Sequence, residues 1–165
     1  SRVRSSFTGQ ELSEIILETL EIKREECWLT SLVKVFLFDD DHVKKYHRLG
    51  KEITENKSRH KEYANRSLQW IRQEIEIANP YAIILLGPEV ISSLLLLSEE
   101  EAMDCITGKV IEKKIIWKNS NFICLPPPGV ILDRSARNPW PRKFAMKIGP
   151  TAMKEIQRLK AQPTL

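Results

Sequence analysis

The sequence is short of the residues and runs that define several common protein classes. It has only three cysteines, Cys27, Cys105 and Cys124, whose wide spacing fits neither a disulfide framework nor a CxxC metal pair. No apolar run approaches the roughly 18 residues of a membrane span, and no apolar stretch follows the basic N-terminus as in a secretory signal. We therefore expect an intracellular protein of the cytoplasm or nucleus, with reduced cysteines and no membrane contact.

Motifs for nucleotide, metal and thiol chemistry are also missing. The GxxxxGK[ST] pattern of a P-loop does not occur. Three histidines, His42, His47 and His60, lie in or near a charged segment, at spacings that match neither HxxxH nor a facial triad. Cys124 falls in a predicted strand with no identifiable basic partner, which favours an inert thiol over a nucleophile. We expect no metal site and no cofactor.

The length and composition indicate one core. With 165 residues, 42% of them hydrophobic and 29% charged, the chain can bury a single sizeable core, so we predict one domain over residues 1–165. Residues 39–57 are highly charged and are predicted to form an irregular insertion loop. Neither an internal repeat nor a low-complexity segment interrupts the chain.

The net charge of +4 is unevenly distributed. Residues 126–165 contain eight Lys or Arg against two acids, a net of +6, whereas residues 1–125 contain 18 against 20, a net of −2. A basic surface of this kind binds phosphates, because neutralising them releases counterions. A solvated basic helix on an ordinary enzyme has the same pattern, so both interpretations stay open.

Hydrophobic periodicity predicts the secondary structure. Apolar residues at helical spacing indicate helices near residues 12–20, 58–79, 89–97 and 152–159. Runs of β-branched, aromatic and aliphatic residues indicate strands at 27–38, 81–86, 114–117 and 122–125, with a turn at 118–121. This alternation predicts an α/β fold, a three-layer α/β/α sandwich with a mostly parallel central sheet.

In such a fold, ligands bind beyond the carboxyl ends of the strands. The last predicted strand is followed by Pro126-Pro127-Pro128-Gly129, which forms either a stiff loop beside a substrate or simply a rigid turn. The next segment couples the aliphatic residues of 130–132 to Arg134 and Arg137. That combination suits a wedge that enters a base stack while cations hold the backbone.

Short motifs in a fixed order connect the chain to a known family. They are Phe7-Thr8-Gly9 with Leu12, residues 28–34, Glu62 with Ala64 and Leu68, Ile75, Asn79-Pro80, residues 83–87, Thr107-Gly108, and residues 123–129 with Ile131-Leu132 beyond. Their order and spacing resemble the uracil-DNA glycosylase superfamily, most closely its iron–sulfur-containing, thermophile-type branch. The resemblance covers most of the chain and implies the family's fold and hydrolysis of N-glycosidic bonds in DNA.

The sequence departs from the family's pattern at its working positions. The asparagine that reads the base in the family is Ser31 here, and a hydroxyl has fewer hydrogen-bonding groups than an amide. The cluster-binding cysteines align with Val35 and Ala64, which cannot ligate iron, so we expect no iron–sulfur cluster. The charge-stabilising histidine aligns with Pro126 or Pro127, which has no donor, and losing such a contact typically costs roughly two to three decades in rate.

The family's first motif, a loop that carries the water-activating residue, is expected before Phe7, where only six residues stand. Either upstream residues, with a first strand, are left out of this sequence, or the protein has lost that half of the site. The sequence therefore leaves the catalytic residues unassigned.

The resemblance still implies positions for binding a flipped base, which must leave the duplex to be reached. Phe7 is the candidate stacking wall and Ser31 the candidate for base recognition, although a core phenylalanine and a hydroxyl capping a strand are the alternatives. The candidate DNA-binding residues are Ile131 and Leu132 as the wedge, with Arg134, Arg137, Arg142 and Lys143 on phosphates. A buried aliphatic pair with a solvated basic rim is the alternative there.

Two functional hypotheses follow. In the first, the chain is an enzyme, a DNA glycosylase that hydrolyses the N-glycosidic bond of a modified or damaged base with altered specificity. In the second, it is a catalytically inactive relative that binds DNA or a protein partner through the same basic face. We favour the first, while the missing first motif and the changes at Ser31 and at Pro126 or Pro127 favour the second. The oligomeric state is not indicated.

Overall fold

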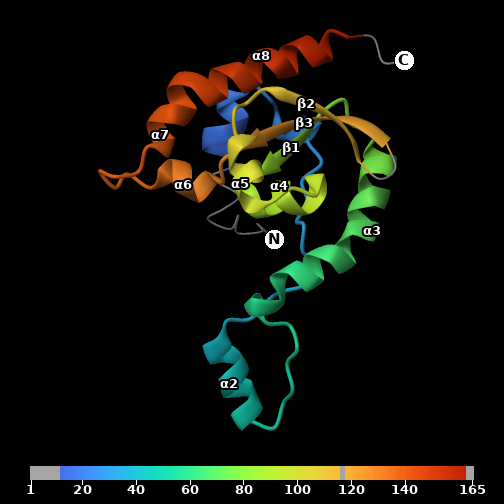
Figure 1. Ribbon diagram of the computed structural model, residues 1–165, viewed down its shortest axis with the longest axis vertical. Helices are drawn as coiled ribbons and strands as arrows, with labels where there is room; N and C mark the ends of the chain where they lie inside the picture. Colours follow the sequence, from blue (N-terminus) through green and yellow to red (C-terminus); the bar gives the residue numbers. More distant parts are fainter. Residues whose placement is uncertain (1–11, 116–117, 163–165) are drawn as a thin grey trace. The chain divides into compact units, whose positions relative to one another are not determined.

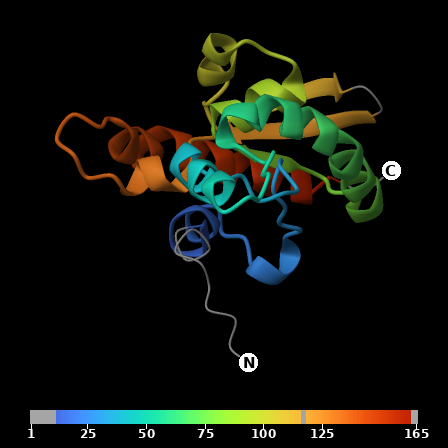
Figure 2. The same ribbon diagram turned by 90° about the horizontal axis from the view of Figure 1, so that it is seen from below.

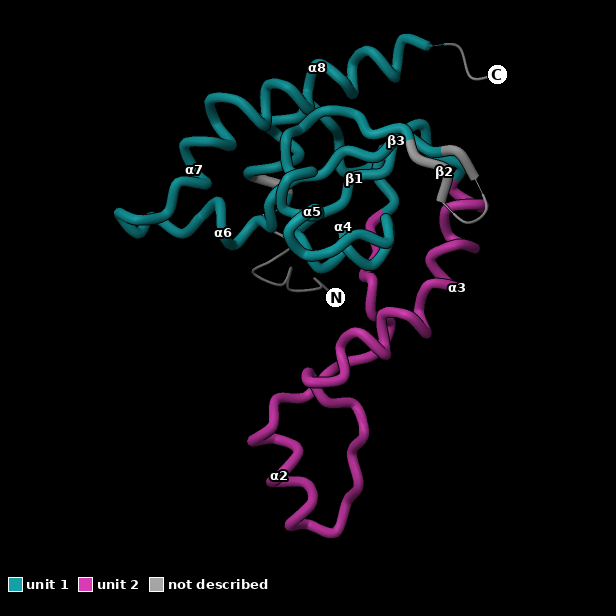
Figure 3. The backbone as a smooth tube through the Cα atoms, in the orientation of Figure 1, with its two compact units in different colours: residues 1–28, 79–165 teal, residues 29–78 magenta. Residues whose placement is uncertain are grey.

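The computed structural model describes residues 12–115 and 118–162 (Figure 1). The chain divides into two compact units, shown in Figure 3: residues 1–28 with 79–165, called unit 1 here, and residues 29–78, called unit 2. Helices and a sheet together give an α/β fold. None of the helices in the described ranges is long and apolar enough to cross a membrane.

The sheet of unit 1 has three strands in the order β1-β3-β2. Strand β1 (Ile83–Leu86) runs parallel to β3 (Lys118–Leu125), and β2 (Val110–Ile115) runs antiparallel to β3. The strands expected at 81–86 and 122–125 are confirmed. Residues 118–121, expected as a turn, belong instead to β3, because they pair with the second half of β2 and extend the hairpin.

The core of unit 1 is centred on β3. Its last four residues, Phe122, Ile123, Cys124 and Leu125, have no exposed surface, so both faces of this strand are covered. Figures 1 and 2 place helix α8 (Gly149–Lys160) on one side of the sheet, and helices α4 (Pro88–Leu95) and α5 (Glu99–Asp104) on the other. Ile91 of α4 and Ile156 of α8 are almost fully buried.

Local signals explain where these helices begin and end. Pro88 opens α4 after Gly87, whose φ of 93° suits glycine, and Leu96 in the left-handed region ends it. Helix α5 begins with a capping box, in which the Ser98 hydroxyl accepts from Glu101 N and the Glu101 carboxylate accepts from Ser98 N. Helix α5 thus satisfies first-turn amides with local side chains, whereas α4 begins at a proline, which has no amide hydrogen.

The N-terminal part of unit 1 packs beside α8. The π-helix η1 (Leu12–Leu17) stands where we expected a helix, and the short 3₁₀ helix η2 (Arg24–Glu26) follows it. A Cβ placed on Gly149 would lie 2.6 Å from the Thr19 methyl carbon, so the two segments are in close contact. Lys160 Nζ lies 2.9 Å from Glu26 Oε2, which ties η2 to the end of α8.

Three short helices connect the sheet to α8. They are α6 (Pro128–Leu132), α7 (Trp140–Lys143) and the π-helix η4 (Phe144–Ile148), which runs directly into α8. Phe144 and Ile148 are buried, so this connection is anchored in the core. The expected helix at 152–159 is confirmed and begins a few residues earlier.

Unit 2 consists of α2 (Asp40–Arg48), the 3₁₀ helix η3 (Lys57–Arg59) and α3 (His60–Ala78). The long helix expected at 58–79 is confirmed. Its Ser67 hydroxyl accepts a hydrogen bond from Lys34 N, and Lys34 Nζ lies 2.8 Å from Glu74 Oε1, which holds the N-terminal segment of unit 2 against α3.

Two expectations for this part of the chain were wrong. Residues 27–38 do not form a strand, and only Phe38 makes an isolated parallel bridge, with Asn56. Trp28 and Phe36 are 66% and 74% exposed, so the apolar residues that suggested a buried strand are not buried. The charged segment 39–57 is not irregular throughout, because α2 forms within it.

Candidate nucleic-acid interface

The carboxyl ends of the parallel strands bring two loops together. Gly87 N donates a hydrogen bond to Leu125 O at 2.9 Å, which extends the β1–β3 ladder by one bond. A Cβ on Gly87 would lie 3.5 Å from Glu89 Oε2 and 3.6 Å from Pro127 Cβ. The start of α4 and the proline loop therefore meet at the edge of the sheet where an α/β fold binds its ligands.

The proline loop is rigid and has no amide hydrogen at three consecutive positions. Pro126 and Pro128 are buried, Pro127 is half-buried, and Pro128 is the first residue of α6. A proline at position 126 or 127 holds no hydrogen-bond donor at all. Any donor to an anionic leaving group must therefore come from another segment.

Helix α6 separates the two aliphatic residues expected to act together. Ile131 is 8% exposed and belongs to the core, whereas Leu132 is 37% exposed. Consecutive side chains on a helix point about 100° apart, so one faces inward and the next outward. Leu132 alone of this pair is available as a wedge at the surface.

The loop after α6 is organised by Asn138. Its Nδ2 donates to Val130 O at 2.6 Å and to Asp133 O at 2.7 Å, and its Oδ1 accepts from Trp140 N at 3.1 Å. The Asp133 carboxylate accepts from the backbone N and the hydroxyl of Ser135. These bonds connect the end of α6 to the start of α7 and fix the loop between them, which carries Arg134 and Arg137.

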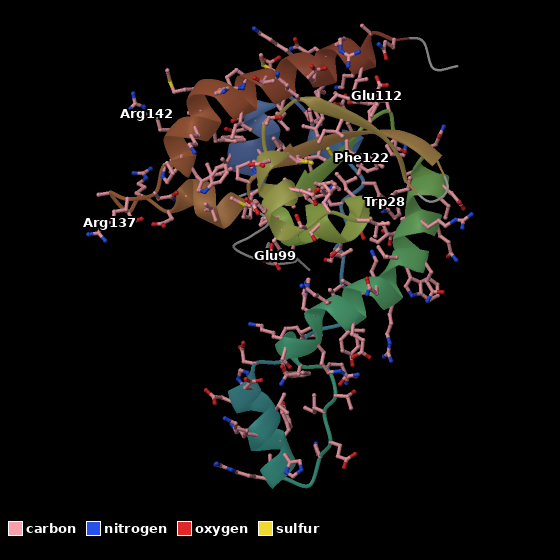
Figure 4. All side chains as sticks on the ribbon, in the orientation of Figure 1. Trp28, Glu99, Glu112, Phe122, Arg137 and Arg142 are labelled. Atoms are coloured by element: carbon pink, nitrogen blue, oxygen red, sulfur yellow. The ribbon has the colours of Figure 1, made fainter. Side chains whose placement is uncertain are left out.

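Cations of this region project from unit 1 without protein partners. Arg134, Arg137 and Arg142 are exposed, and the structure shows no ion pair or hydrogen bond between their side chains and any described residue. Figure 4 shows Arg137 at the far end of the loop and Arg142 on α7, both pointing outward. Lys143 Nζ lies 5.4 Å from the centroid of the Trp140 ring, within cation–π range.

The basic residues at the end of α8 behave differently. Arg158 pairs with Glu155, and Lys160 pairs with Glu26. Four of the basic residues expected to form the basic surface of residues 126–165 lie in residues 134–143, which we call the basic loop, while Lys147 and Lys154 are exposed on η4 and α8. Asp133 is the single acid among residues 126–143, and Ser135 satisfies its carboxylate.

The two residues expected to contact the base, Phe7 and Ser31, stay predictions. Phe7 lies outside the described residues. Ser31 is exposed and belongs to unit 2, in an irregular segment rather than at the end of a strand. The sequence also gave no reason to select Glu89, because only the pairing of β1 with β3 brings residue 89 beside Pro127.

The Cys124 thiol is free and buried. Burial raises the pKa of the Cys124 thiol to about 12, with a smaller contribution from Cys105 nearby. Across residues 12–115 and 118–162, no three His, Cys, Asp or Glu side chains come together as metal ligands. Val35 and Ala64, the positions that align with cluster cysteines, are 44% and 0% exposed.

The comparison with known families gives one clear result. No curated protein matches the chain. A family model, that of the Uracil DNA glycosylase superfamily, matches residues 2–148, which is most of the chain and includes the proline loop and the basic loop. Members of that superfamily are mostly DNA glycosylases, which are hydrolases of N-glycosidic bonds. Because this match covers most of the chain, the chain belongs to the uracil-DNA glycosylase superfamily.

Proposed function

We propose that this protein binds DNA through the basic loop and removes a modified or damaged base by hydrolysing its N-glycosidic bond, with altered base specificity. The observation that carries the proposal is the set of exposed arginines after α6, whose side chains have no ion pair or hydrogen bond with any residue that the structure describes. The backbone phosphates of DNA would be the anionic partners of these arginine side chains. Superfamily membership supplies the reaction class.

Leu132 supports the base-flipping step. A base must be extruded from the duplex to be reached, at a cost of a few kcal/mol. An exposed aliphatic side chain next to phosphate-binding arginines can fill the vacated space and offset part of that cost. Leu132 is exposed next to one of these arginines, because the exposed residues Asp133 and Arg134 follow it in the sequence.

The altered specificity is supported by the residues at the base-reading positions. Phe7 would stack on the base and Ser31 would contact its Watson–Crick edge, where a hydroxyl presents one donor in place of an amide. The covered faces of β3 support a three-layer sandwich. Val35 and Ala64 cannot ligate iron, which supports a protein without an iron–sulfur cluster. A DNA substrate supports an intracellular site of action.

Glu89 is the carboxylate that we assign to water activation. Hydrolysis needs a base that can accept a proton from the attacking water. Glu89 is exposed at the start of α4, and a Cβ on Gly87 would lie 3.5 Å from its Oε2 and 3.6 Å from Pro127 Cβ. It also lies in the first turn of α4, where a carboxylate favourably meets the helix dipole.

A base-release assay tests this function. Duplexes with uracil or one of several modified pyrimidines are incubated with the protein under single-turnover conditions. We expect release from at least one substrate, and a loss of about 100-fold or more in the Glu89→Gln variant, within the range of general base catalysis. Glu100→Gln on α5 is the matched control, because it removes the same charge from an exposed position in the same unit.

A second candidate function is favoured by the proline loop. Pro126 and Pro127 cannot stabilise charge on a departing base, which fits a superfamily member that binds DNA or a protein without catalysis. Salt-sensitive DNA binding without release of any base would establish this candidate and exclude the enzyme. Binding of a protein and not of DNA would exclude the DNA-binding role of the basic loop and leave only the protein-binding form of this candidate.

A further inference from the structure

A second concentration of positive charge lies in unit 2. Residues 44–51 contain Lys44, Lys45, Arg48 and Lys51 together with His47, and no acid. They cover the second half of α2 and the turn after it, and all five side chains are exposed. We call this group the α2 cations. It belongs to the charged segment to which the sequence assigned only a solvated loop.

Three acids of the same segment, residues 39–41, lie at the start of α2, whereas Glu52 and Glu55 follow the α2 cations. Asp39 Oδ1 lies 2.6 Å from Lys57 Nζ, and this hydrogen bond lowers the pKa of Asp39 below its usual value. Asp40 Oδ1 accepts from Asn56 Nδ2 at 2.7 Å. Asp39 and Asp40 are thus engaged by Lys57 and Asn56 at the start of α2, ahead of Lys45, Arg48 and Lys51 in the sequence.

Three of the α2 cations differ from most other basic residues of unit 2, whereas Lys44 has its Nζ 4.0 Å from Asp41 Oδ1. Lys45, Arg48 and Lys51 make no ion pair or hydrogen bond through their side chains to any residue in the described ranges. Most of the unit's other cations stand beside a carboxylate: Lys34 with Glu74, Lys57 with Asp39, Arg59 and Arg66 with Glu62, and Arg72 with Glu76.

The surface of α2 is also hollowed beside these cations, with a mostly apolar lining. Val43, Lys44, His47 and Arg48 line an open hollow of about 360 Å³ on α2. Lys44 and Arg48 are four residues apart, so their side chains lie on one face of the helix. An edge-to-face contact between Phe38 and Tyr46, with ring centroids 5.8 Å apart, holds α2 in unit 2.

Helix stability accounts for only part of this pattern. Cations in a last helical turn favourably meet the helix dipole, at about 0.3–1 kcal/mol each. Lys45, His47 and Arg48 occupy that turn. Lys51 lies beyond the helix and Lys44 precedes the last turn, so the dipole does not explain why the whole run is basic and free of acids.

We infer that the α2 cations form a second DNA-binding surface, which contacts backbone phosphates without reading sequence. This inference rests on DNA being the partner, as in the proposed function, but it concerns a different unit and different residues. Lys45, Arg48 and Lys51 contribute charge, and Lys44, His47 and Arg48 surround the hollow. Counterion release then makes this contact strongly dependent on salt.

The test measures DNA affinity of the full chain across a series of salt concentrations, with two unrelated duplex sequences. The triple variant Lys45→Ala, Arg48→Ala, Lys51→Ala is expected to weaken binding about tenfold or more for both sequences. The slope of log K against log salt should fall by about two to three units, since each lost phosphate contact removes about 0.9. Far-UV circular dichroism verifies that the variant is folded.

The matched control is Lys57→Ala, Arg66→Ala, Arg72→Ala. It removes three cations from the same unit, each of which already stands beside a carboxylate. We expect a clearly smaller change in slope. An equal change in both triple variants, or none in the first, overturns the inference.

The double variant Arg137→Ala, Arg142→Ala separates this inference from the proposed function. If the salt slope is lower in this variant and unchanged in the α2 triple variant, the basic loop is supported as a DNA interface and the second surface is overturned. If the reverse holds, the second surface stands and the basic loop is not the interface. A wild-type chain that does not bind DNA overturns both.

Discussion

Asn138 Nδ2 lies 2.6 Å from Val130 O, a hydrogen bond that joins the loop before α7 to the middle of α6. The same nitrogen donates to Asp133 O, so one side-chain amide satisfies two carbonyls at the end of a short helix. Short helices leave such carbonyls without intrahelical partners. The shape of the basic loop therefore depends on one donor.

Replacing that donor should loosen the loop. Asn138→Asp retains the acceptor for Trp140 N but removes both donated bonds. We expect a loss of about 1–3 kcal/mol in the free energy of unfolding, because buried or half-buried carbonyls lose partners, together with weaker DNA binding. Asn121→Asp removes a single bond, to Tyr81 O, and should leave DNA affinity unchanged. Equal DNA affinities for wild type and Asn138→Asp would show that the loop needs no such support.

Single cations of the basic loop should act on affinity without changing sequence preference. Arg134→Ala or Lys143→Ala is expected to weaken binding about equally for different duplexes and to lower the salt slope by about one unit per lost phosphate contact. Arg158→Ala serves as the control, because Arg158 is already paired with Glu155. An unchanged slope in both variants would remove the basic loop from the account of DNA binding.

Gly108 should tolerate no side chain. A Cβ there would lie 2.3 Å from Ile148 O, and the φ of 76° is in the left-handed region. Gly108→Ala should therefore lower the free energy of unfolding by at least about 2 kcal/mol, from backbone strain and overpacking together. Gly129→Ala, where a Cβ meets nothing within 4 Å, should change it little. Thermal or urea unfolding of the two variants gives the comparison, and equal losses would contradict this packing.

The pair between Glu26 and Lys160 should stabilise unit 1 in a limited pH range. The hydrogen bond from Lys160 lowers the pKa of Glu26 below 4.5, and the same bond raises the pKa of Lys160 above 10.5. The contribution of Glu26 is therefore present above pH 4.5 and is lost as the pH falls through its lowered pKa. The contribution of Lys160 is present below pH 10.5 and is lost as the pH rises through its raised pKa.

The measurement is the difference in melting temperature between wild type and Glu26→Gln. We expect a small positive difference at neutral pH, because both partners are near the surface, and a smaller one well below the lowered pKa of Glu26. A difference that stays constant with pH would assign the effect to packing and not to charge.

The sequence predicted elements best where one face or both faces are buried. Helix α3 and strand β1 follow from apolar spacing because burial enforces that spacing. The segment 27–38 has the composition of a strand, but a strand also needs a neighbour, and Trp28 and Phe36 remain exposed. Helix α2 did carry a signal, with Asp39 before it and basic residues in its last turn, but the high charge of the segment obscured it.

The candidate site was predictable in composition and not in geometry. The basic character of 134–143 is visible in the residues alone. The separation of Ile131 from Leu132 requires knowing that α6 turns between them. Glu89 becomes a candidate only through the register that pairs Leu86 with Leu125, since residues 89 and 127 are far apart in sequence.

The opposite charges at the two ends of α2 also bear on the speed of association. The helix begins at three consecutive aspartates and ends among lysines and an arginine, so unit 2 carries an electric dipole along α2. In the field of a polyanion, such a dipole turns its basic end forward before any contact is made. Productive encounters then become more frequent, and they decline as salt shortens the range of the field. Reversing the order of charges along α2 at constant composition would leave the net charge unchanged and slow the approach.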